Sequence, residues 1–162
     1  MSLLAQQPFR PISLKDLRRI GFTAPWAHAI ILPFPVNLIT GDAMPLRITG
    51  GKARGLRLRS PVSQGIRPTA DRIRGAIFSI LRNHVAESPK VLDLYAGTGS
   101  FGIEALSRGA AQADFVEQNR AQCVAIKENL KFTGFTDLGR VYCGLVERLM
   151  TTVSGPYDLV FL

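Results

Sequence analysis

An apolar segment that leads into a glycine-rich turn, Val91-Leu-Asp-Leu-Tyr-Ala-Gly-Thr-Gly99, limits what this chain can form. Residues 90–94 predict a buried strand, and residues 100–108 predict a helix that ends at Gly109. Gly97 and Gly99 let the backbone approach a ligand closely, because neither carries a Cβ atom. The N-terminus of the following helix offers free N–H groups at the same place. The segment therefore predicts a ligand site at the end of a strand.

The remainder of the C-terminal half repeats the alternation of strand and helix. Residues 113–117 predict a second strand and residues 119–132 a second helix. A short strand around Val141-Tyr142 and a helical stretch over residues 145–152 follow, and Gly155-Pro156 turns the chain into a fourth strand, residues 157–162. Such an alternation is typical of a parallel sheet with helices on both faces. We therefore expect an α/β fold of the Rossmann-like type, with a doubly wound parallel sheet.

A small hairpin and a helix are predicted before this unit. Residues 47–59 alternate around glycines and indicate a β-hairpin with its turn at Gly50-Gly51, and residues 61–68 indicate a loop. Thr69 can cap a helix that runs to about residue 85, with Asp71 in its first turn. The apolar face of this helix is predicted to consist of Ile73, Ile77, Ile80 and Leu81. Three arginines lie off that face and are expected to stay solvated or to meet phosphate: Arg72, Arg74 and Arg82.

The positive charge of the chain is concentrated in this hairpin and helix. The net charge is +8, and residues 47–84 hold nine basic residues against Asp71 alone. Residues 85–162 hold seven basic and nine acidic residues, a net charge of −2. Eight of the nine basic residues are arginines, whose planar guanidinium groups suit phosphate. The block favours a polyanionic partner such as nucleic acid; the alternative is a solvated surface that only aids solubility.

The first 43 residues differ from the rest because prolines interrupt them and no helix or strand period is visible. Their apolar stretch, residues 27–39, is too short to span a bilayer and lacks the features of a secretory signal. We expect residues 1–43 to be a loose N-terminal extension, or sequence upstream of a true start at Met44. Residues 44–88 are expected to form the basic hairpin and helix, and residues 89–162 the N-terminal half of the α/β domain.

Cysteine and histidine are scarce. Cys123 and Cys143 lie twenty positions apart, and the histidines are His28 and His84. This number provides neither a disulfide framework nor a paired metal-ligand spacing. We expect a chain of a reducing compartment, the cytoplasm, without a metal.

Two carboxylates lie at the ends of adjacent predicted strands, Asp93 before the glycine turn and Glu117 after the second strand. Parallel strands would place both beside the turn, where Glu117 can accept hydrogen bonds from two ribose hydroxyls. Gly97, Gly99 and Gly102 also match the dinucleotide fingerprint, so a nicotinamide or flavin oxidoreductase is an alternative. Asp93 opposes that alternative, because its charge would repel a pyrophosphate. A carboxylate suits a cationic ligand such as S-adenosylmethionine, which carries a sulfonium and an ammonium group.

Three further segments carry recognisable motifs, namely Arg47-Ile-Thr-Gly-Gly-Lys-Ala-Arg-Gly, Arg67-Pro-Thr-Ala-Asp-Arg-Ile-Arg-Gly-Ala-Ile-Phe-Ser-Ile-Leu81 and Asp93-Leu-Tyr-Ala-Gly-Thr-Gly-Ser-Phe-Gly-Ile-Glu-Ala-Leu-Ser-Arg-Gly109. They resemble the RsmD-type methyltransferases, which modify the exocyclic amine of a guanine (guanine-N2) in 16S ribosomal RNA of the small subunit. The second contains an Arg-Pro-Thr-x-Asp-Arg-x-Arg block that is characteristic of the family. The resemblance covers about residues 44–162.

The resemblance implies the Rossmann-like S-adenosylmethionine-dependent methyltransferase fold and a substrate in ribosomal RNA or the small ribosomal subunit, with no membrane partner. Asp93, Gly97 and Gly99 would hold the methionine part of the cofactor, with Tyr95 beside them, and Glu117 would hold its ribose. The arginines on the RNA side would be Arg47, Arg54, Arg67, Arg72 and Arg74.

Two departures from the family pattern qualify this expectation. An Asp or Asn usually faces adenine after the third strand, whereas this chain has Cys143-Gly144-Leu145, which leaves that contact to a backbone N–H. The catalytic motif of the family, an Asp or Asn followed by two prolines and an aromatic residue, is expected beyond Leu162. No catalytic residue is therefore assigned, and the chain is expected to be an incomplete, inactive portion. A non-catalytic nucleic-acid-binding fragment is the second reading, ahead of the oxidoreductase.

Overall fold

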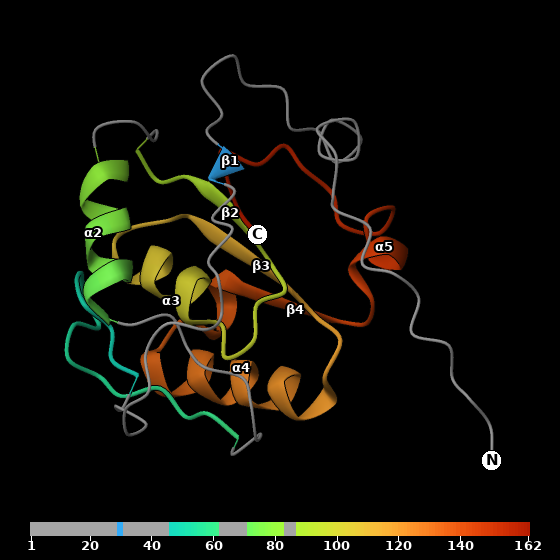
Figure 1. Cartoon of the computed structure of the whole chain (residues 1–162), viewed down its shortest axis with the longest axis horizontal. Helices are drawn as coiled ribbons and strands as arrows, with labels where there is room; N and C mark the ends of the chain where they lie inside the picture. Colours follow the sequence, from blue (N-terminus) through green and yellow to red (C-terminus); the bar gives the residue numbers. More distant parts are fainter. Residues whose placement is uncertain (1–28, 31–45, 62–70, 83–86) are drawn as a thin grey trace.

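The computed structural model describes residues 29–30, 46–61, 71–82 and 87–162 (Figure 1). Its centre is a sheet in the order β1-β5-β2-β3-β4, in which every pairing is parallel. The strands are β1 (Ala29–Ile30), β2 (Lys90–Leu94), β3 (Gln112–Glu117), β4 (Gly139–Cys143) and β5 (Leu159–Phe161). The chain proceeds outward from β2 to β4 and then returns past β2 to β5. Open α/β sheets bind ligands at such a reversal, beside the carboxyl ends of the strands.

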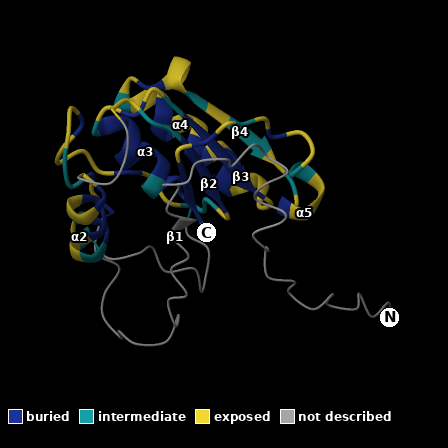
Figure 2. Cartoon of the chain, turned by 90° about the horizontal axis from the view of Figure 1, so that it is seen from above, coloured by how far each residue is buried: buried dark blue, intermediate teal, exposed yellow. Residues whose placement is uncertain are grey.

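Helices cover both faces of the sheet (Figures 1 and 2). On one face, α2 (Asp71–Leu81), α3 (Ser100–Ser107) and α4 (Arg120–Thr133) form a core with Val91 and Phe115. On the other face, α5 (Val146–Leu149) packs with Leu92, Val116 and Val160. A 3₁₀ turn, η1 (Thr136–Leu138), joins α4 to β4. The predicted doubly wound parallel fold is confirmed.

Two local signals set the limits of α4. The Asn119 Oδ1 atom accepts from the N–H groups of Ala121 (2.9 Å) and Gln122 (3.3 Å), which caps the helix. Gly134 ends it with φ at 78°, in the left-handed region that glycine tolerates. The cap residue lies two positions after Glu117, so it also fixes the chain at the end of β3.

The buried face of helix α2 overlaps the predicted one at Ile77 and Leu81 but is rotated from it. Its buried residues are Arg74, Ile77, Phe78 and Leu81, whereas Ile80 is 64% exposed. The face is rotated toward Phe78 because that ring packs against Phe101 (centroids 6.3 Å apart) and Phe161 (5.6 Å). The prediction was wrong for Ile80 and for Arg74.

Residues 46–61, here called the basic ribbon, form a narrow antiparallel loop. Arg47 pairs with Arg57, and the Ile48 N–H donates to the Leu56 carbonyl (3.0 Å). The turn spans residues 51–55, so it contains the predicted Gly51 but lies further along the chain than Gly50-Gly51. Both glycines also pack against the end of α3, where a Cβ atom would collide with Arg108 or with the Ser107 backbone.

Strand β1 lies inside the N-terminal segment for which no regular structure was expected. Ala29 pairs with Val160 and Ile30 with Phe161, so β1 occupies the free edge of β5. The expectation was wrong at these two residues. An edge strand presents unpaired backbone N–H and C=O groups, which can pair with a short segment even if its side chains show no strand pattern.

Several predictions lie outside the described residues, namely the rest of residues 1–43, the cap at Thr69 and Arg67. Within the described parts of the chain, no helix is both long and apolar enough to cross a membrane.

Candidate functional site

The glycine turn leaves β2 and enters α3 through three residues with positive φ. These are Tyr95 (57°), Gly97 (55°) and Gly99 (76°). The turn is held by the Ala96 N–H, which donates to Val116 (3.0 Å), and by the Gly99 N–H, which donates to Ala96 (2.7 Å). Its backbone is therefore anchored on β3 and shaped before any ligand arrives.

Asp93 lies at the base of this turn, with 3% of its surface exposed. Its Oδ2 atom accepts from the Gly102 N–H in the first turn of α3 (2.9 Å). Burial raises the pKa of Asp93 from 3.8 to about 7; the Gly102 N–H lowers it and the charge of Glu117 raises it further. A carboxylate in this position attracts a cation, because a positive neighbour restores the charged form.

Glu117, at the end of β3, closes the other side of the turn. Its Oε2 atom accepts from the Gly97 N–H (2.8 Å), and its Oε1 atom accepts from the Asn119 N–H (2.7 Å). Each carboxylate oxygen has a second lone pair, so each can also accept from a ligand hydroxyl. The prediction that the strand ends bring Glu117 to the turn is confirmed by this geometry.

The three glycines of the fingerprint have different surroundings. A Cβ atom on Gly102 would collide with the Phe115 ring, and one on Gly99 would lie 3.1 Å from Ile126. Both glycines therefore permit close packing of the turn and α3 on the sheet. Nothing lies within 4 Å of the Cβ position of Gly97, so only at Gly97 among these three is the space beside the backbone open.

A hollow of about 640 Å³ lies beyond the ends of β3 and β4. It is lined by Gln118, Asn119, Cys143, Gly144, Leu145, Arg148 and Leu149. The adenine contact was expected from a backbone N–H of Cys143-Gly144-Leu145, and of these the Gly144 N–H donates to the Glu117 carbonyl (2.8 Å). The hollow lies directly beside Glu117 and mixes apolar side chains with polar groups.

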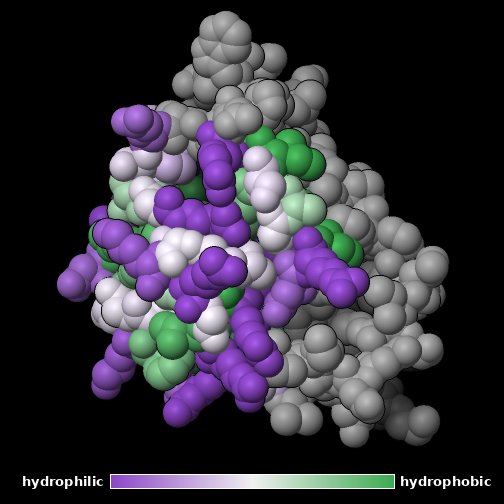
Figure 3. All heavy atoms as spheres, turned by 90° about the vertical axis from the view of Figure 1, so that its left-hand side faces the viewer, coloured by the Kyte–Doolittle hydropathy of each residue, from purple (hydrophilic) through white to green (hydrophobic). Residues whose placement is uncertain are grey.

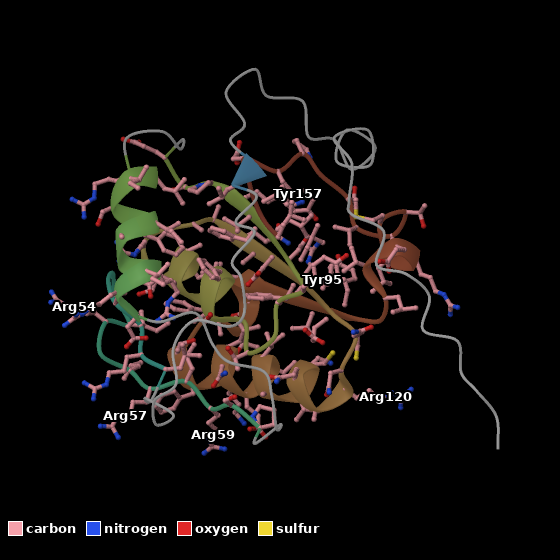
Figure 4. The ribbon with its side chains drawn as sticks, in the orientation of Figure 1. Arg54, Arg57, Arg59, Tyr95, Arg120 and Tyr157 are labelled. Atoms are coloured by element: carbon pink, nitrogen blue, oxygen red, sulfur yellow. The ribbon has the colours of Figure 1, made fainter. Side chains whose placement is uncertain are left out.

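Tyr95 lies between the turn and α5 (Figure 4). The residue is 38% exposed, and its hydroxyl lies 3.5 Å from Glu147 Oε1. Partial burial raises the pKa of Tyr95, and the charge of Glu147 adds to the rise. Its left-handed φ is uncommon outside glycine, asparagine and aspartate, and such conformations are often found at functional sites.

The basic residues gather on one side of the molecule. Figure 3 shows hydrophilic side chains over the face that carries α2 and the basic ribbon. Arg54, Arg57 and Arg59 project from the ribbon into solvent (Figure 4). The described basic residues of this block that are exposed are Arg47, Lys52, Arg54, Arg57, Arg59, Arg72 and Arg82.

Arg74 does not belong to this surface, and its assignment as an RNA-side residue was wrong. Its side chain is fully buried, with Nε 3.3 Å from Glu104 Oε2 and an NH2 group 2.9 Å from Asp71. The same NH2 group donates to the Arg47 carbonyl. Arg74 therefore fastens the basic ribbon to α2 and α3.

Glu104 and Asn129 are two buried polar residues that the sequence analysis missed. Glu104 accepts from the Thr49 N–H and hydroxyl (2.7 Å each), from Arg74 and from the Arg108 Nε atom (2.8 Å). The signal in the sequence was a charged residue on an otherwise apolar helix face. Such a residue can be buried only where hydrogen-bond or ion-pair partners meet it.

The expectation that the chain holds no metal can be compared only with the residues that the structure describes. Among the described residues, no group of three or more His, Cys, Asp and Glu side chains could hold an ion, and neither cysteine forms a disulfide.

A family model described as conserved hypothetical protein 95 matches residues 46–162. Ribosomal RNA small subunit methyltransferase D of Escherichia coli K12 is 44% identical over 117 residues, which are 72% of this chain and 58% of that protein. The putative rRNA methyltransferase YlbH of Bacillus subtilis is 33% identical over 105 residues, 65% of this chain and 56% of that protein.

A solved structure, the putative methyltransferase yhhF from Escherichia coli, aligns with a TM-score of 0.65 and 33% identity, over 74% of this chain and 63% of that chain. The chain thus spans 58% and 56% of the length of the two curated relatives. Its parallel sheet and its helices are those of the Rossmann-like methyltransferase fold. Because the family model covers residues 46–162 and the resemblance of the three motifs is confirmed, the chain belongs to the RsmD-type methyltransferase family.

Proposed function

We propose that this chain binds S-adenosylmethionine at the glycine turn and small-subunit ribosomal RNA at the basic ribbon, for methylation of a guanine exocyclic amine. The observation that carries the proposal is the pair of carboxylates, Asp93 and Glu117, on either side of the open Gly97 backbone. The names of the relatives, ribosomal RNA methyltransferases, support the substrate class. A ribosomal RNA substrate agrees with the expected cytoplasmic location.

The two carboxylates fit opposite ends of this cofactor. The ammonium group of its methionine part is a cation that the buried Asp93 carboxylate can neutralise. Its ribose has two hydroxyls, and the Glu117 oxygens have lone pairs left to accept from both. The hollow beside Glu117 then lies where the base of the nucleoside would extend. When bound, the cofactor supplies an electrophilic methyl group on its sulfonium.

The dinucleotide alternative fits these residues less well. A pyrophosphate is bound by the free N–H groups of the glycine turn and the helix N-terminus. Here the Gly102 N–H already donates to Asp93, and the Gly97 N–H already donates to Glu117. A dinucleotide would have to displace both carboxylates, and it would meet their charge.

Methylation also requires that the target guanine be activated and held in place. An exocyclic guanine amine is a weak nucleophile, since its lone pair is delocalised into the ring, so an acceptor must draw on its protons and a ring must stack the flipped base. The Asp/Asn-Pro-Pro-aromatic motif that would do so does not occur within the 162 residues. The residues in this chain are therefore assigned to binding and orienting the cofactor and to binding RNA phosphates. Holding the two reactants close together contributes to the rate.

Calorimetric titration of the chain with S-adenosylmethionine tests the proposal, with NAD as the competing ligand. We expect binding of S-adenosylmethionine and none of NAD, and Glu117→Gln should weaken the affinity at least tenfold, because a charged acceptor is worth on the order of 1.5–3 kcal/mol. Arg140→Gln, an exposed change at the start of β4, serves as the control. Binding of NAD alone, or of RNA without the cofactor, would establish one of the alternatives.

A further inference from the structure

The side chain of Asn129 clamps the end of the basic ribbon from within α4. Its Oδ1 atom accepts from the Arg59 N–H (2.8 Å), and its Nδ2 group donates to the Arg59 carbonyl (2.9 Å). Asn129 is fully buried and pairs with the ribbon as a neighbouring strand would. The backbone position of Arg59 is thereby fixed, although its side chain is solvent-exposed.

The same amide connects this clamp to the glycine turn. The Nδ2 group of Asn129 also lies 3.3 Å from the carbonyl oxygen of Thr98, which stands between Gly97 and Gly99. One side chain therefore contacts both the backbone of Arg59 and the backbone of the turn. The end of the ribbon is held at the edge of the candidate cofactor site.

The turn of the ribbon and its C-terminal end lie at opposite ends of α3. Near residues 50–53, the Lys52 N–H donates to the Ser107 carbonyl (2.7 Å) and the Ala53 N–H to the Ser107 hydroxyl (2.9 Å), at the C-terminus of α3. Arg59 lies beside Thr98, which precedes the N-terminus of α3. Arg54 therefore lies nearer the far end of α3, whereas Arg59 is the ribbon arginine clamped at the turn.

The guanidinium group of Arg59 forms an exposed ion pair with Glu128, which another anion can replace. It contacts Glu128 Oε2 at 3.4 Å, and the two side chains are 75% and 52% exposed. An exposed pair of this kind contributes little to stability, about 0–1 kcal/mol. An RNA phosphodiester carries the same single charge as Glu128, but it offers the guanidinium a bidentate partner and its binding releases counterions from the RNA, which favours replacement of Glu128.

We propose that Arg59 contacts an RNA phosphate at the edge of the glycine turn, and that Asn129 is the residue that positions it. This assignment rests on the proposed function, since it requires an RNA ligand. It adds Arg59 to the residues that resemblance alone had indicated, and it gives Asn129 a role outside the core.

Fluorescence anisotropy with a labelled single-stranded RNA of mixed sequence, measured between 50 and 200 mM salt, tests the assignment. We expect Arg59→Gln to weaken binding about fivefold and to flatten the log–log salt slope by about 0.7, the loss of one phosphate contact. Glu128→Gln should strengthen binding about twofold, because it removes a competing carboxylate. The matched control, Arg140→Gln, removes one exposed charge from the start of β4 and should leave the slope unchanged.

Asn129→Ala tests positioning in the same assay. It should weaken RNA binding in the wild-type background but add nothing in the Arg59→Gln background. Should Asn129→Ala fail to fold, the surface changes at Arg59 and Glu128 still decide the phosphate contact. Equal slopes for Arg59→Gln and Arg140→Gln, with RNA bound by the wild type, would overturn this inference alone. Absence of RNA binding by the wild type would overturn the RNA part of the proposed function and this inference with it.

Discussion

At the scale of single residues, the site depends on two carboxylates in unlike surroundings. Glu117 is stabilised by two backbone N–H groups, whereas Asp93 receives one and lies at 3% exposure in the base of the turn. A buried carboxylate without a cation stores unfavourable energy in the folded chain. A cationic ligand recovers that energy, which links the stability of the free chain to its affinity for the ligand.

Asp93→Asn should make the free chain more stable at pH 8 and leave the stability nearly unchanged at pH 3. The folded chain holds the Asp93 proton up to about pH 7 and the unfolded chain releases it near 3.8, so wild-type stability falls as the pH rises between these values. Each pKa unit corresponds to about 1.4 kcal/mol, which gives a difference of up to about 4 kcal/mol. Urea unfolding of both chains across this range measures it.

The same substitution should abolish tight binding of S-adenosylmethionine, because asparagine cannot neutralise an ammonium group. Gain of stability with loss of affinity is the expected signature of a residue kept for ligand binding. A stability difference that does not change with pH would show that Asp93 is not the titrating group.

At the scale of elements, the sequence could predict the features that depend on nearby residues. Strand β2, the glycine turn, the cap of α4 and the meeting of Asp93 with Glu117 all follow from residues close in sequence or from the register of parallel strands. The burial of Arg74 could not be predicted, because its partner Glu104 lies 30 positions away. Asn129 reaches Arg59 across 70 positions, so its role is likewise invisible before the elements pack.

The glycine turn offers a prediction at this scale, since its glycines serve different purposes. Gly102→Ala places a methyl group against the Phe115 ring and should destabilise the chain by about 1–3 kcal/mol through overpacking. Gly97→Ala meets open space but must keep φ at 55°, which costs about 1 kcal/mol. We expect it to weaken S-adenosylmethionine binding more than it weakens the fold. Thermal unfolding and calorimetry on both variants compare the two effects.

The docking of the basic ribbon on α2 and α3 depends on Glu104. Glu104→Ala leaves the fully buried Arg74 with a partly compensated charge and removes both contacts of Thr49, so we expect a loss of about 3–5 kcal/mol in the free energy of unfolding. Glu128→Ala, which removes an exposed partner of Arg59, should change it by less than 1 kcal/mol. Similar losses for both would show that the buried network does not hold the ribbon.

At the scale of the whole molecule, charge is divided between two surfaces. Residues 47–84 carry nine basic residues and one acid, while residues 85–162 are net negative and hold the candidate cofactor site. The exposed basic residues of the described part of the block lie on the basic ribbon and α2, and Figure 3 shows hydrophilic side chains over that face. Under the proposed function, RNA would bind on that side, with Arg59 held beside the glycine turn because Asn129 joins its backbone to that of Thr98.

Because Arg74 is structural, the phosphate contacts must be tested on the exposed arginines. Replacement of Arg47, Arg54 and Arg72 together by glutamine should flatten the log–log salt slope of RNA binding by about two units, at about 0.7 for each phosphate contact on single-stranded RNA. A control triple variant, in which Arg120, Lys131 and Arg140 become glutamine, removes the same charge from exposed positions outside the block. If the block grips phosphates directly, only the first variant changes the slope, and both keep their affinity for S-adenosylmethionine. If the net charge alone attracts RNA, the two variants weaken binding equally, and the basic face is then no more than a solvated surface.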